Sequence, residues 1–298
     1  MNAAAIDGLL VVDKPSGMTS RTAVDTALRW FPRGTRLGHT GTLDPLATGL
    51  LVLCLGNATR LVEYVQKMGK TYRASFLLGA RSDTDDADGN VVPVPGAAAP
   101  EAAEVLACLA AFLGTIEQVP PAYSAAKVGG KRAYDLARRG DEVSLRPRAV
   151  TISSIEILDY HYPHLDLQVR CGKGTYIRSL ARDTGKRLGC GALVETLQRT
   201  RLGPFMVEEA VPWDADAESA RARLLPMERA VVELPRLFLS EADLWRLRRG
   251  QSVPLAEAPS RFEREGETAI FDADGRLVAI GRIDSSCKLL LPSKVLRS

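Results

Sequence analysis

The chain has 298 residues, of which 46% are hydrophobic, and its formal net charge is +3. That length and apolar content suit about two globular domains, and no apolar run approaches the roughly 20 residues that span a membrane. Met1 to Val12 lacks the basic start and cleavage site of a signal peptide, so a cytoplasmic protein with no membrane partner is expected. The five cysteines form no CxxC pair, which indicates neither a disulfide framework nor a zinc site.

Basic residues are concentrated in two segments of the chain. Residues 120–148 hold seven Lys/Arg against three Asp/Glu, and residues 170–201 hold eight against two. Such concentration is expected of a surface that follows a phosphate backbone, whereas a solvated basic face is the alternative for either segment alone. A nucleic acid is therefore a candidate partner.

The first predicted elements are a short strand, a turn-rich loop and a helix. Leu9 to Val12 is apolar, and the string DKPSGMTS at 13–20 is punctuated by proline and glycine. Ser20 is the predicted N-cap of a helix whose apolar residues recur with helical spacing until Pro32 stops it. Taken alone, Lys14 in this loop is typical of a lysine at the surface.

The stretch GHTGTLDPLATG at 38–49 has the composition of a shaped loop. Its glycines permit positive φ and close approach of the backbone to a ligand. Pro45 disfavours the α conformation for Asp44, so the carboxylate is presented from a constrained turn. The apolar run at 50–55 then predicts a buried strand. A carboxylate at the mouth of a core strand is a candidate catalytic group, and a turn-stabilising Asx residue is the alternative.

Residues 71–78 alternate apolar and polar side chains, as in a half-buried strand with Tyr72 on its apolar face. Three motif-like strings nearby lack essential residues. The GKT at 69–71 lacks the first glycine of a phosphate-binding loop, and the acidic run at 83–89 lacks the first and twelfth ligands of a calcium loop. The SAAK at 124–127 lacks the partner motifs of the penicillin-binding enzymes. Neither a nucleotide cofactor nor a metal is therefore expected.

Residues 101–113 predict a helix that ends at Gly114, with one apolar stripe that core packing explains. The stripe consists of Val105, Leu106, Leu109, Phe112 and Leu113. Glycines, tyrosines and cations then follow one another from 118 to 139.

Alternation at 165–171 predicts another strand, and the apolar spacing after it predicts a helix that ends at a glycine. Between them lies the string CGKGTYIRSL at 171–180. From about Leu234 the pattern changes to a short helix at 240–249 and brief strands, with a hairpin turn at 274–275.

Four strings of the chain resemble, in the right order, the motifs of the TruB family of tRNA pseudouridine synthases. They are KPSGMTS at 14–20, GHTGTLDPLATG at 38–49, CGKGTYIRSL at 171–180 and LQRTRLGPF at 197–205. The resemblance covers residues 9–205 and, more loosely, the tail. It implies an α+β pseudouridine-synthase fold with a central mixed, mostly antiparallel sheet flanked by helices and loops. It also implies a catalytic domain at 1–233 and a small PUA-like β-barrel domain that binds RNA at 234–298.

The resemblance assigns roles to five residues of the site. Asp44 is implied to be the catalytic carboxylate, and Arg178 the cation paired with it. A nearby guanidinium keeps a carboxylate ionised and oriented, as a nucleophile requires. Tyr72 is implied to act in catalysis against the target base, and Tyr176 to contact the target nucleotide. His39 is implied to stack in the place that the flipped-out base leaves.

Further residues are implied in substrate and RNA binding. Leu197 matches an apolar residue of the site, and Lys14 lies in the motif that packs beside the catalytic loop, where it is expected to bind substrate. The basic segment at 120–148 corresponds to an insertion that closes on the RNA, for which mobile glycines, stacking tyrosines and cations are suited. Its candidate RNA-binding residues are Lys127, Lys131 and Arg132.

The implied activity is isomerisation of uridine to pseudouridine at position 55, in the T arm of tRNA. The N1–C1′ bond breaks, the base turns and rejoins through C5, and nothing is oxidised, so no cofactor is needed. A monomer is expected, and the atom that Asp44 attacks stays open. One alternative is a non-catalytic RNA-binding or tRNA-folding protein, which would have lost one of Asp44, Tyr72 and Arg178. Another is a guide-RNA-dependent relative that modifies ribosomal RNA, against which the basic insertion argues.

Overall fold

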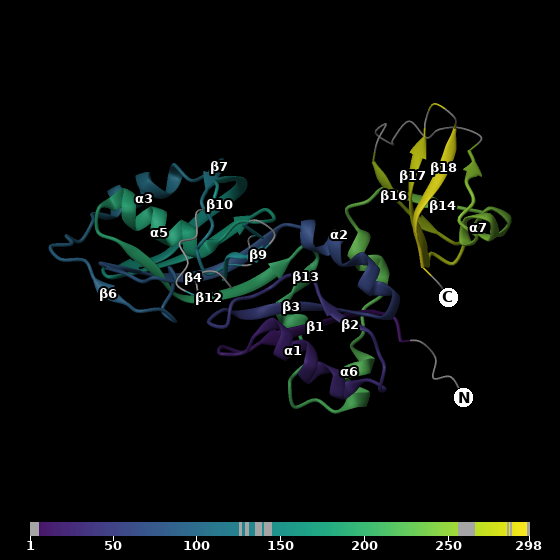
Figure 1. Cartoon of the computed structure of the whole chain (residues 1–298), viewed down its shortest axis with the longest axis horizontal. Helices are drawn as coiled ribbons and strands as arrows, with labels where there is room; N and C mark the ends of the chain where they lie inside the picture. The colour runs from purple at the N-terminus through teal and green to yellow at the C-terminus, as the bar shows by residue number, and fades with distance from the viewer. Residues whose placement is uncertain are drawn as a thin grey trace.

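The computed structural model describes residues 6–124, 127–128, 131–134, 139, 145–255, 266–284, 286 and 288–296. For residues 127–128 and 131–132 it describes the backbone only. The molecule is elongated, with a large sheet and its helices along most of its length and a smaller C-terminal sheet at one end (Figure 1).

A nine-stranded sheet organises most of the described chain. Its strands are β1 (Gly8–Lys14), β2 (Leu37–His39), β3 (Thr48–Leu55), β4 (Lys70–Leu78), β7 (Gly114–Gln118), β10 (Arg148–His161), β11 (His164–Cys171), β12 (Ala192–Leu202) and β13 (Phe205–Met206). The main order is β1-β3-β12-β4-β11-β10-β7, while β2 pairs with β3 and β13 with β12. The β12–β3 pairing is parallel and the others are antiparallel. The expected mixed, mostly antiparallel sheet is confirmed.

Two halves of this sheet meet where β12 runs beside β3. Only Gln198 with Thr48 and Arg199 with Gly49 are in register across this parallel pairing. Gly49 has φ +95°, and a Cβ there would lie 2.4 Å from the carbonyl oxygen of Arg199. Glycine is therefore required for the two strands to approach, immediately after the loop that carries Asp44.

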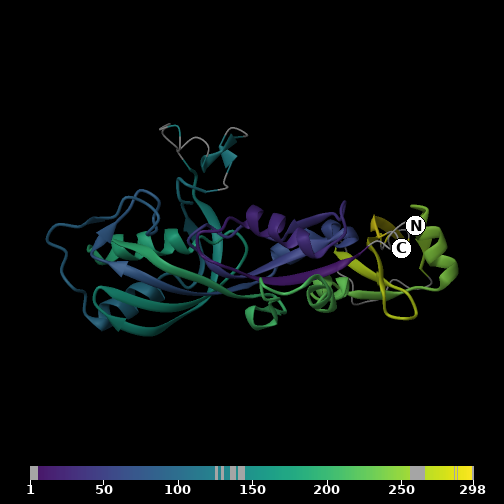
Figure 2. The ribbon, with the colours of Figure 1, turned by 90° about the horizontal axis from the view of Figure 1, so that it is seen from below.

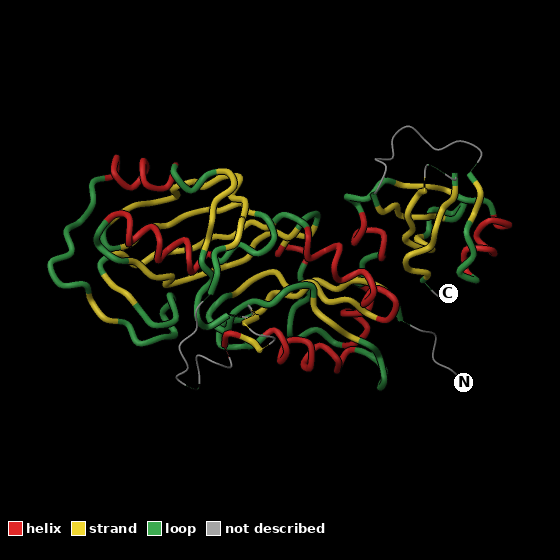
Figure 3. The backbone as a smooth tube through the Cα atoms, turned by 45° about the horizontal axis from the view of Figure 1, so that its top comes forward, coloured by secondary structure: helices red, strands yellow, loops and turns green. Residues whose placement is uncertain are grey.

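Helices and short turns cover and connect the sheet, and Figure 3 shows how they alternate with the strands. The α-helices whose bounds lie within the described ranges are α1 (Ser20–Ala27), α2 (Val62–Lys67), α3 (Ala102–Ala110), α5 (Ile177–Leu188), α6 (Ala217–Ala222) and α7 (Glu241–Arg248). The 3₁₀ turns are η1 (Leu28–Trp30), η2 (Gly56–Leu61), η3 (Val207–Glu209) and η4 (Met227–Val231). None of the helices in the described ranges has the length and hydrophobicity that crossing a bilayer requires.

Several predicted elements are confirmed because their apolar spacing is a strong local signal. In β3, seven of the eight residues are buried, as its continuous apolar run predicts. On β4 the buried side chains alternate with less buried ones, and Arg73 is exposed. The helix at 177–188 ends at Gly189 in the left-handed conformation.

Two details of the helices differ from the sequence prediction. Thr19, and not Ser20, caps α1, because its hydroxyl accepts the N–H of Thr22 at 3.0 Å. Core packing explains only part of the apolar stripe along α3, since Leu106 is 62% exposed and Leu113, just after the helix, is 47% exposed. Neighbouring hydroxyl residues are equivalent as caps in sequence, and only tertiary packing distinguishes them.

Two small two-stranded sheets lie outside the large one. β5 (Ala80–Arg81) pairs with β6 (Val92–Pro93), and β8 (Lys127–Val128) pairs with β9 (Lys131–Arg132). The β8–β9 pair stands clear of the large sheet in Figure 2. It lies within the basic segment at 120–148 that the sequence analysis singled out.

The C-terminal sheet consists of β14 (Arg236–Phe238), β15 (Val253–Pro254), β16 (Glu267–Phe271), β17 (Leu277–Asp284) and β18 (Leu289–Val295). Its order is β14-β16-β17-β18-β15, so the pairing of the described strands does not close into a barrel. The hairpin predicted at 274–275 joins β16 to β17, with Gly275 at φ +78°. The PUA-like nature of this sheet stays a prediction.

The C-terminal sheet is bound to the body of the molecule through η2, α2 and η4. The ammonium of Lys294 pairs with the carboxylate of Glu63 and donates to the carbonyl of Arg60 at 3.0 Å. The N–H of Leu277 donates to the Glu228 carboxylate at 2.8 Å. One apolar cluster includes buried residues of both parts, among them Val231, Ala269, Phe271 and Leu296.

Candidate active site

A pocket of about 260 Å³ lies beside the junction of β3 and β12. Its walls come from the loop after β2, the starts of β4 and α5, and the C-terminal half of β12. Five of the predicted site residues line this one pocket: Asp44, Tyr72, Tyr176, Arg178 and Leu197. Segments more than 100 residues apart in sequence thus meet where the resemblance implies a catalytic centre.

The loop that carries Asp44 is supported by the preceding motif at 14–20, as expected. Lys14 donates from its ammonium to the carbonyls of Pro15, Met18 and Pro45 at 2.9, 2.7 and 3.2 Å. The Ser20 hydroxyl is buried, donates to the carbonyl of Leu43 at 3.1 Å and accepts its N–H at 2.8 Å. The Ser20 hydroxyl, which the sequence predicted as the cap of α1, therefore holds the loop that carries Asp44 instead.

Lys14 is buried, which differs from the surface position typical of a lone lysine in a loop. Burial lowers the pKa of Lys14 to about 8, and the Asp44 carboxylate partly opposes that shift. An ammonium has three N–H donors, and the three carbonyls use all of them. In this structure Lys14 supports the loop, and the substrate contact that the sequence implied for it stays a prediction.

Arg178 pairs with Asp44 at the edge of the pocket. Its Nη2 lies 2.8 Å from Asp44 Oδ2, and its Nη1 lies 3.4 Å from Asp86 Oδ2. The guanidinium also donates to the carbonyls of Thr84 and Tyr123, both at 2.9 Å. The side chains of Arg178 and Asp86 are 5% and 6% exposed, whereas that of Asp44 is 35% exposed. The buried arginine is thus held by Asp86 and two backbone carbonyls, and it pairs with the more accessible carboxylate of Asp44, which lines the pocket.

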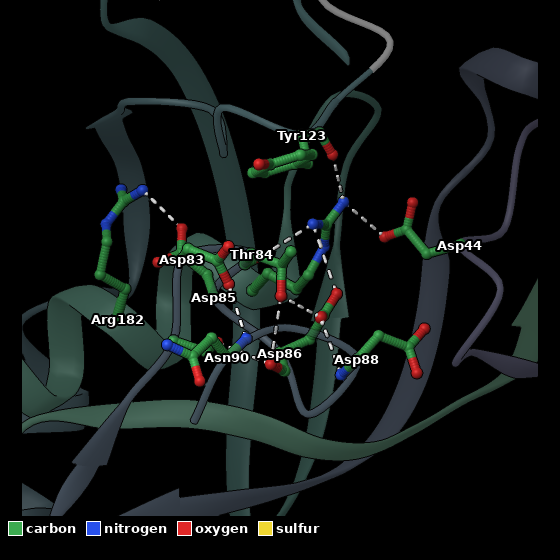
Figure 4. Close-up of polar contacts among 11 residues, drawn as sticks. Asp44, Asp83, Thr84, Asp85, Asp86, Asp88, Asn90, Tyr123 and Arg182 are labelled. Carbon is green, nitrogen blue, oxygen red and sulfur yellow. Dashed lines mark hydrogen bonds and ion pairs between the residues drawn. The ribbon is translucent and has the colours of Figure 1, made fainter. Parts of the chain in front are cut away.

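The acidic run at 83–89 supplies the support that sequence reasoning missed. Two carboxylates of this run lie beside arginines of α5: Asp86 faces Arg178, and Asp85 accepts from Arg182 at 2.9 Å. Thr84 donates its hydroxyl to Asp86 Oδ1 at 2.5 Å (Figure 4). Burial is the main cause that raises the pKa of Asp86 above its ordinary value, against the effects of Thr84 and Arg178. The spacing of Arg178 and Arg182, one helical turn apart in the predicted helix, was the feature of the sequence that could have indicated this acidic partner loop.

Two cationic side chains that the sequence analysis did not assign also line the pocket. Arg199 is 1% exposed and donates from Nε to the carbonyl of Leu50 at 2.8 Å, while its Nη2 has no hydrogen-bond partner among the described residues. Lys70 donates to the carbonyls of Gln66 and Met68 at 2.9 and 2.8 Å, and burial lowers its pKa to about 8. Such a cationic site favours an anionic substrate.

Tyr72 and His39 occupy different positions relative to the pocket. Tyr72 is 8% exposed, lines the pocket, and has a pKa raised by burial. His39 ends β2 outside the residues that line the pocket, and its Nδ1 accepts the N–H of Gly41 at 3.3 Å. Burial lowers the pKa of His39, which favours the neutral ring that this acceptor role requires. Its role in filling the place of a flipped base stays a prediction.

The side chains of the three candidate RNA-binding residues, Lys127, Lys131 and Arg132, lie outside what the structure describes. In the described ranges, no group of three or more His, Cys, Asp or Glu side chains is placed to hold a metal ion. The pocket therefore offers an oriented carboxylate, aromatic rings and fixed cations as its chemistry.

Comparison with known proteins identifies the family. Residues 29–177 match the model of the TruB family pseudouridylate synthase (N terminal domain), and residues 178–232 match that of the tRNA pseudouridylate synthase B C-terminal domain. The chain is 40% identical over 290 residues to tRNA pseudouridine synthase B of Xanthomonas axonopodis pv. citri (strain 306), covering 95% of this chain and 92% of the relative. It is 42% identical over 284 residues to tRNA pseudouridine synthase B of Burkholderia mallei (strain NCTC 10247), covering 93% of each.

Solved structures show the same fold over almost the whole chain. A chain of the "Crystal Structure of a Cbf5-Nop10-Gar1 Complex" matches with a TM-score of 0.74 and 27% identity, covering 97% of this chain and 85% of that one. A chain of the "Structure of H/ACA RNP bound to a substrate RNA containing 2'-deoxyuridine" also reaches a TM-score of 0.74. It is 23% identical and covers 98% of this chain and 85% of that one, which supports the fold alone. From the family models and the curated relatives together, the chain belongs to the TruB family of pseudouridylate synthases.

Proposed function

We propose that this chain is a tRNA pseudouridine synthase that isomerises the uridine at position 55 in the T loop. The observation that carries the proposal is the 2.8 Å pair between Arg178 and Asp44 at the edge of a cationic pocket. The relatives named tRNA pseudouridine synthase B support tRNA as the substrate. We place the enzyme in the cytoplasm, acting as a monomer and without a cofactor.

In the proposed mechanism Asp44 is the nucleophile, and Arg178 favours and orients its charged form. The N1–C1′ bond of uridine breaks, the uracil turns within the pocket, and C5 bonds to C1′. C5 then loses its proton and N1 gains one, so the product is an isomer of the substrate. Tyr72 lies against the base, Tyr176 and Leu197 help to bind the nucleotide, and His39 stacks where the base left the RNA. The proposal leaves open which atom Asp44 attacks.

The RNA must also be bound by surfaces outside the pocket. We assign that role to the basic segment at 120–148, including Lys127, Lys131 and Arg132, which would bind phosphates of the T arm. We also assign RNA binding to a C-terminal domain at 234–298, which begins between the end of η4 and the start of β14.

A guide-RNA-dependent enzyme is the second candidate function. A chain that is solved in a complex with other chains, the Cbf5-Nop10-Gar1 complex, shares this fold, so an activity that depends on partner molecules is the alternative to test. An assay that supplies no guide RNA separates the two candidates.

The test is to incubate the purified full-length chain with a T-arm transcript and map pseudouridine by position. We expect modification at uridine 55 without added RNA or protein, and none in a matched transcript with cytidine at that position. Unmodified transcript, or modification only after a guide RNA is added, would overturn the proposal.

Deletion of residues 236–298 is expected to leave the catalytic domain folded, with weaker tRNA binding and some turnover at high enzyme concentration. Thermal stability should fall, because Val231 loses apolar cover and Glu63 loses its partner Lys294. Melting curves and tRNA binding isotherms measure the two effects. Glu63→Gln in the full chain is the control, since it removes the ion pair and keeps the C-terminal domain. An unfolded truncated protein would contradict the proposed boundary.

A further inference from the structure

We propose that Gln118 is a positioning residue for catalysis, whose buried side-chain amide clamps the main chain of Tyr176 and so fixes the start of α5. The inference rests on the proposed function and concerns the same pocket. It gives a role to the first residue of the QVPP string at 118–121, which the mechanism above does not use.

The clamp consists of two hydrogen bonds between one side chain and one residue's backbone. Gln118 Oε1 accepts the N–H of Tyr176 at 2.8 Å, and Gln118 Nε2 donates to the Tyr176 carbonyl at 3.1 Å. The backbone groups determine which way the amide faces, because an N–H needs an acceptor and a carbonyl needs a donor. Gln118 is 2% exposed, so water does not readily replace either bond.

The position of the clamp matters because the start of α5 has no side-chain cap of its own. Tyr176 is the N-cap residue of α5, and its side chain makes no capping hydrogen bond. Helix starts leave backbone N–H groups without partners, so their orientation depends on outside contacts. Here the outside contact comes from the last residue of β7, 58 positions earlier in the chain.

The clamp orients residues that take part in the proposed reaction. Tyr176 and Arg178 both line the pocket, and Arg178 holds Asp44 at 2.8 Å. A displacement of the first turn of α5 would therefore move the Arg178 guanidinium, and with it the Asp44 carboxylate that the guanidinium holds. A misplacement of about 1 Å is enough to cost roughly 100-fold in rate.

Neighbouring contacts hold α5 itself, which separates the role of Gln118 from general support of the helix. The Val119 carbonyl accepts from the Ser179 hydroxyl and from Arg182 Nη2, both at 2.8 Å. These bonds use the backbone of residue 119, so they survive a change of the side chain at 118. Loss of the amide should release the Tyr176 N–H and leave α5 docked, since the Tyr176 carbonyl still accepts the N–H of Leu180 at 3.1 Å.

Three variants test the proposal: Gln118→Met, Gln118→Glu and the control Gln168→Met. Methionine fills a similar space without either hydrogen bond. Gln168 lies on β11 outside the pocket and donates its amide to Glu156 at 2.9 Å, so its replacement also removes one amide hydrogen bond. Each protein is measured for single-turnover pseudouridine formation, tRNA affinity, and hydrogen exchange at the Tyr176 amide.

We expect Gln118→Met to react about 10- to 100-fold more slowly while its tRNA Kd changes less than about twofold, with faster exchange at Tyr176. The control should match wild type in all three measurements. For Gln118→Glu, the rate relative to wild type should rise as the pH falls, because the protonated carboxyl again offers one donor and one acceptor. Burial raises the pKa of such a carboxyl, which brings that recovery toward the neutral range.

A folded Gln118→Met variant with the wild-type rate would overturn the proposal, and so would a loss carried entirely by Kd. If that variant does not fold, a Gln118→Glu pH profile parallel to that of wild type overturns it. Wild-type protein that forms no pseudouridine refutes the proposed function instead, while exchange at Tyr176 still tests the clamp.

Discussion

Asp44→Asn is expected to bind tRNA nearly as tightly as the wild-type chain and to form no detectable pseudouridine. Asparagine keeps the size and shape of the side chain, and its amide oxygen can still accept from Arg178. It carries no negative charge and cannot act as a carboxylate nucleophile. Lys14 and Ser20 hold the loop through the carbonyls of Pro45 and Leu43, so the loop should keep its shape.

The alternative for Asp44 was a residue that merely stabilises its own turn. Among the described contacts, its carboxylate pairs with Arg178, while the turn is closed by the backbone bond from the N–H of Ala47 to the carbonyl of Asp44 at 3.1 Å. A turn-stabilising aspartate would show the opposite pattern on replacement, with lower stability and retained activity. Melting temperature, tRNA affinity and pseudouridine yield on one preparation decide between them. Turnover by a correctly folded variant would refute the nucleophile assignment.

Arg178→Met is expected to abolish activity and to destabilise the fold by about 3–5 kcal/mol, the usual cost of breaking a buried ion pair. The variant leaves Asp86 6% exposed without its cation, and it frees Asp44 from its orienting partner. Arg178→Lys should be milder, because a point charge remains but the planar fork that contacts two carboxylates and two carbonyls is lost. Denaturant unfolding and single-turnover rates measure the two effects.

The pH dependence of Arg178→Met gives a further check on the same variant. Burial already raises the pKa of Asp86, and removing the cation raises it further. A carboxyl with a raised pKa binds more protons in the folded state, so lost stability should return as the pH falls through that pKa. The matched control is Arg182→Met one turn later, where the side chain is 30% exposed and a smaller loss is expected. Equal losses of stability in both variants would show that the ion pairs of Arg178 contribute no more to stability than those of Arg182.

Local patterns predicted the elements of this fold better than its polar partnerships. The apolar run of β3 and the alternation of β4 are properties of short windows, so they could be read before any tertiary contact was known. The motif strings implied that Arg178 pairs with Asp44, and the structure contains that ion pair at 2.8 Å. In contrast, the outward position of Leu106 depends on what packs beside α3.

The charged side chains that surround Asp44 and Arg178 could not be predicted from the sequence, for a physical reason. Asp86 belongs to a run of carboxylates that look alike in sequence, and only the fold selects the one that faces Arg178. Arg199 lies two residues after Leu197 on a strand that also bears the exposed Arg201, and its burial results from the pairing with β3. Long-range neighbours decide the environment of a charged side chain, whereas apolar periodicity is local.

The buried ammonium of Lys14 bears on when the catalytic loop becomes ordered. Three carbonyls converge on one cation, and that of Pro45 belongs to the residue that follows Asp44. These bonds need no RNA, so the conformational entropy of the loop is lost when the chain folds and not when the substrate arrives. Association with RNA is then spared the ordering cost that a mobile loop would add. In the proposed mechanism the carboxylate then meets each incoming uridine from a preorganised geometry, and binding energy remains available for drawing the base out of its stack.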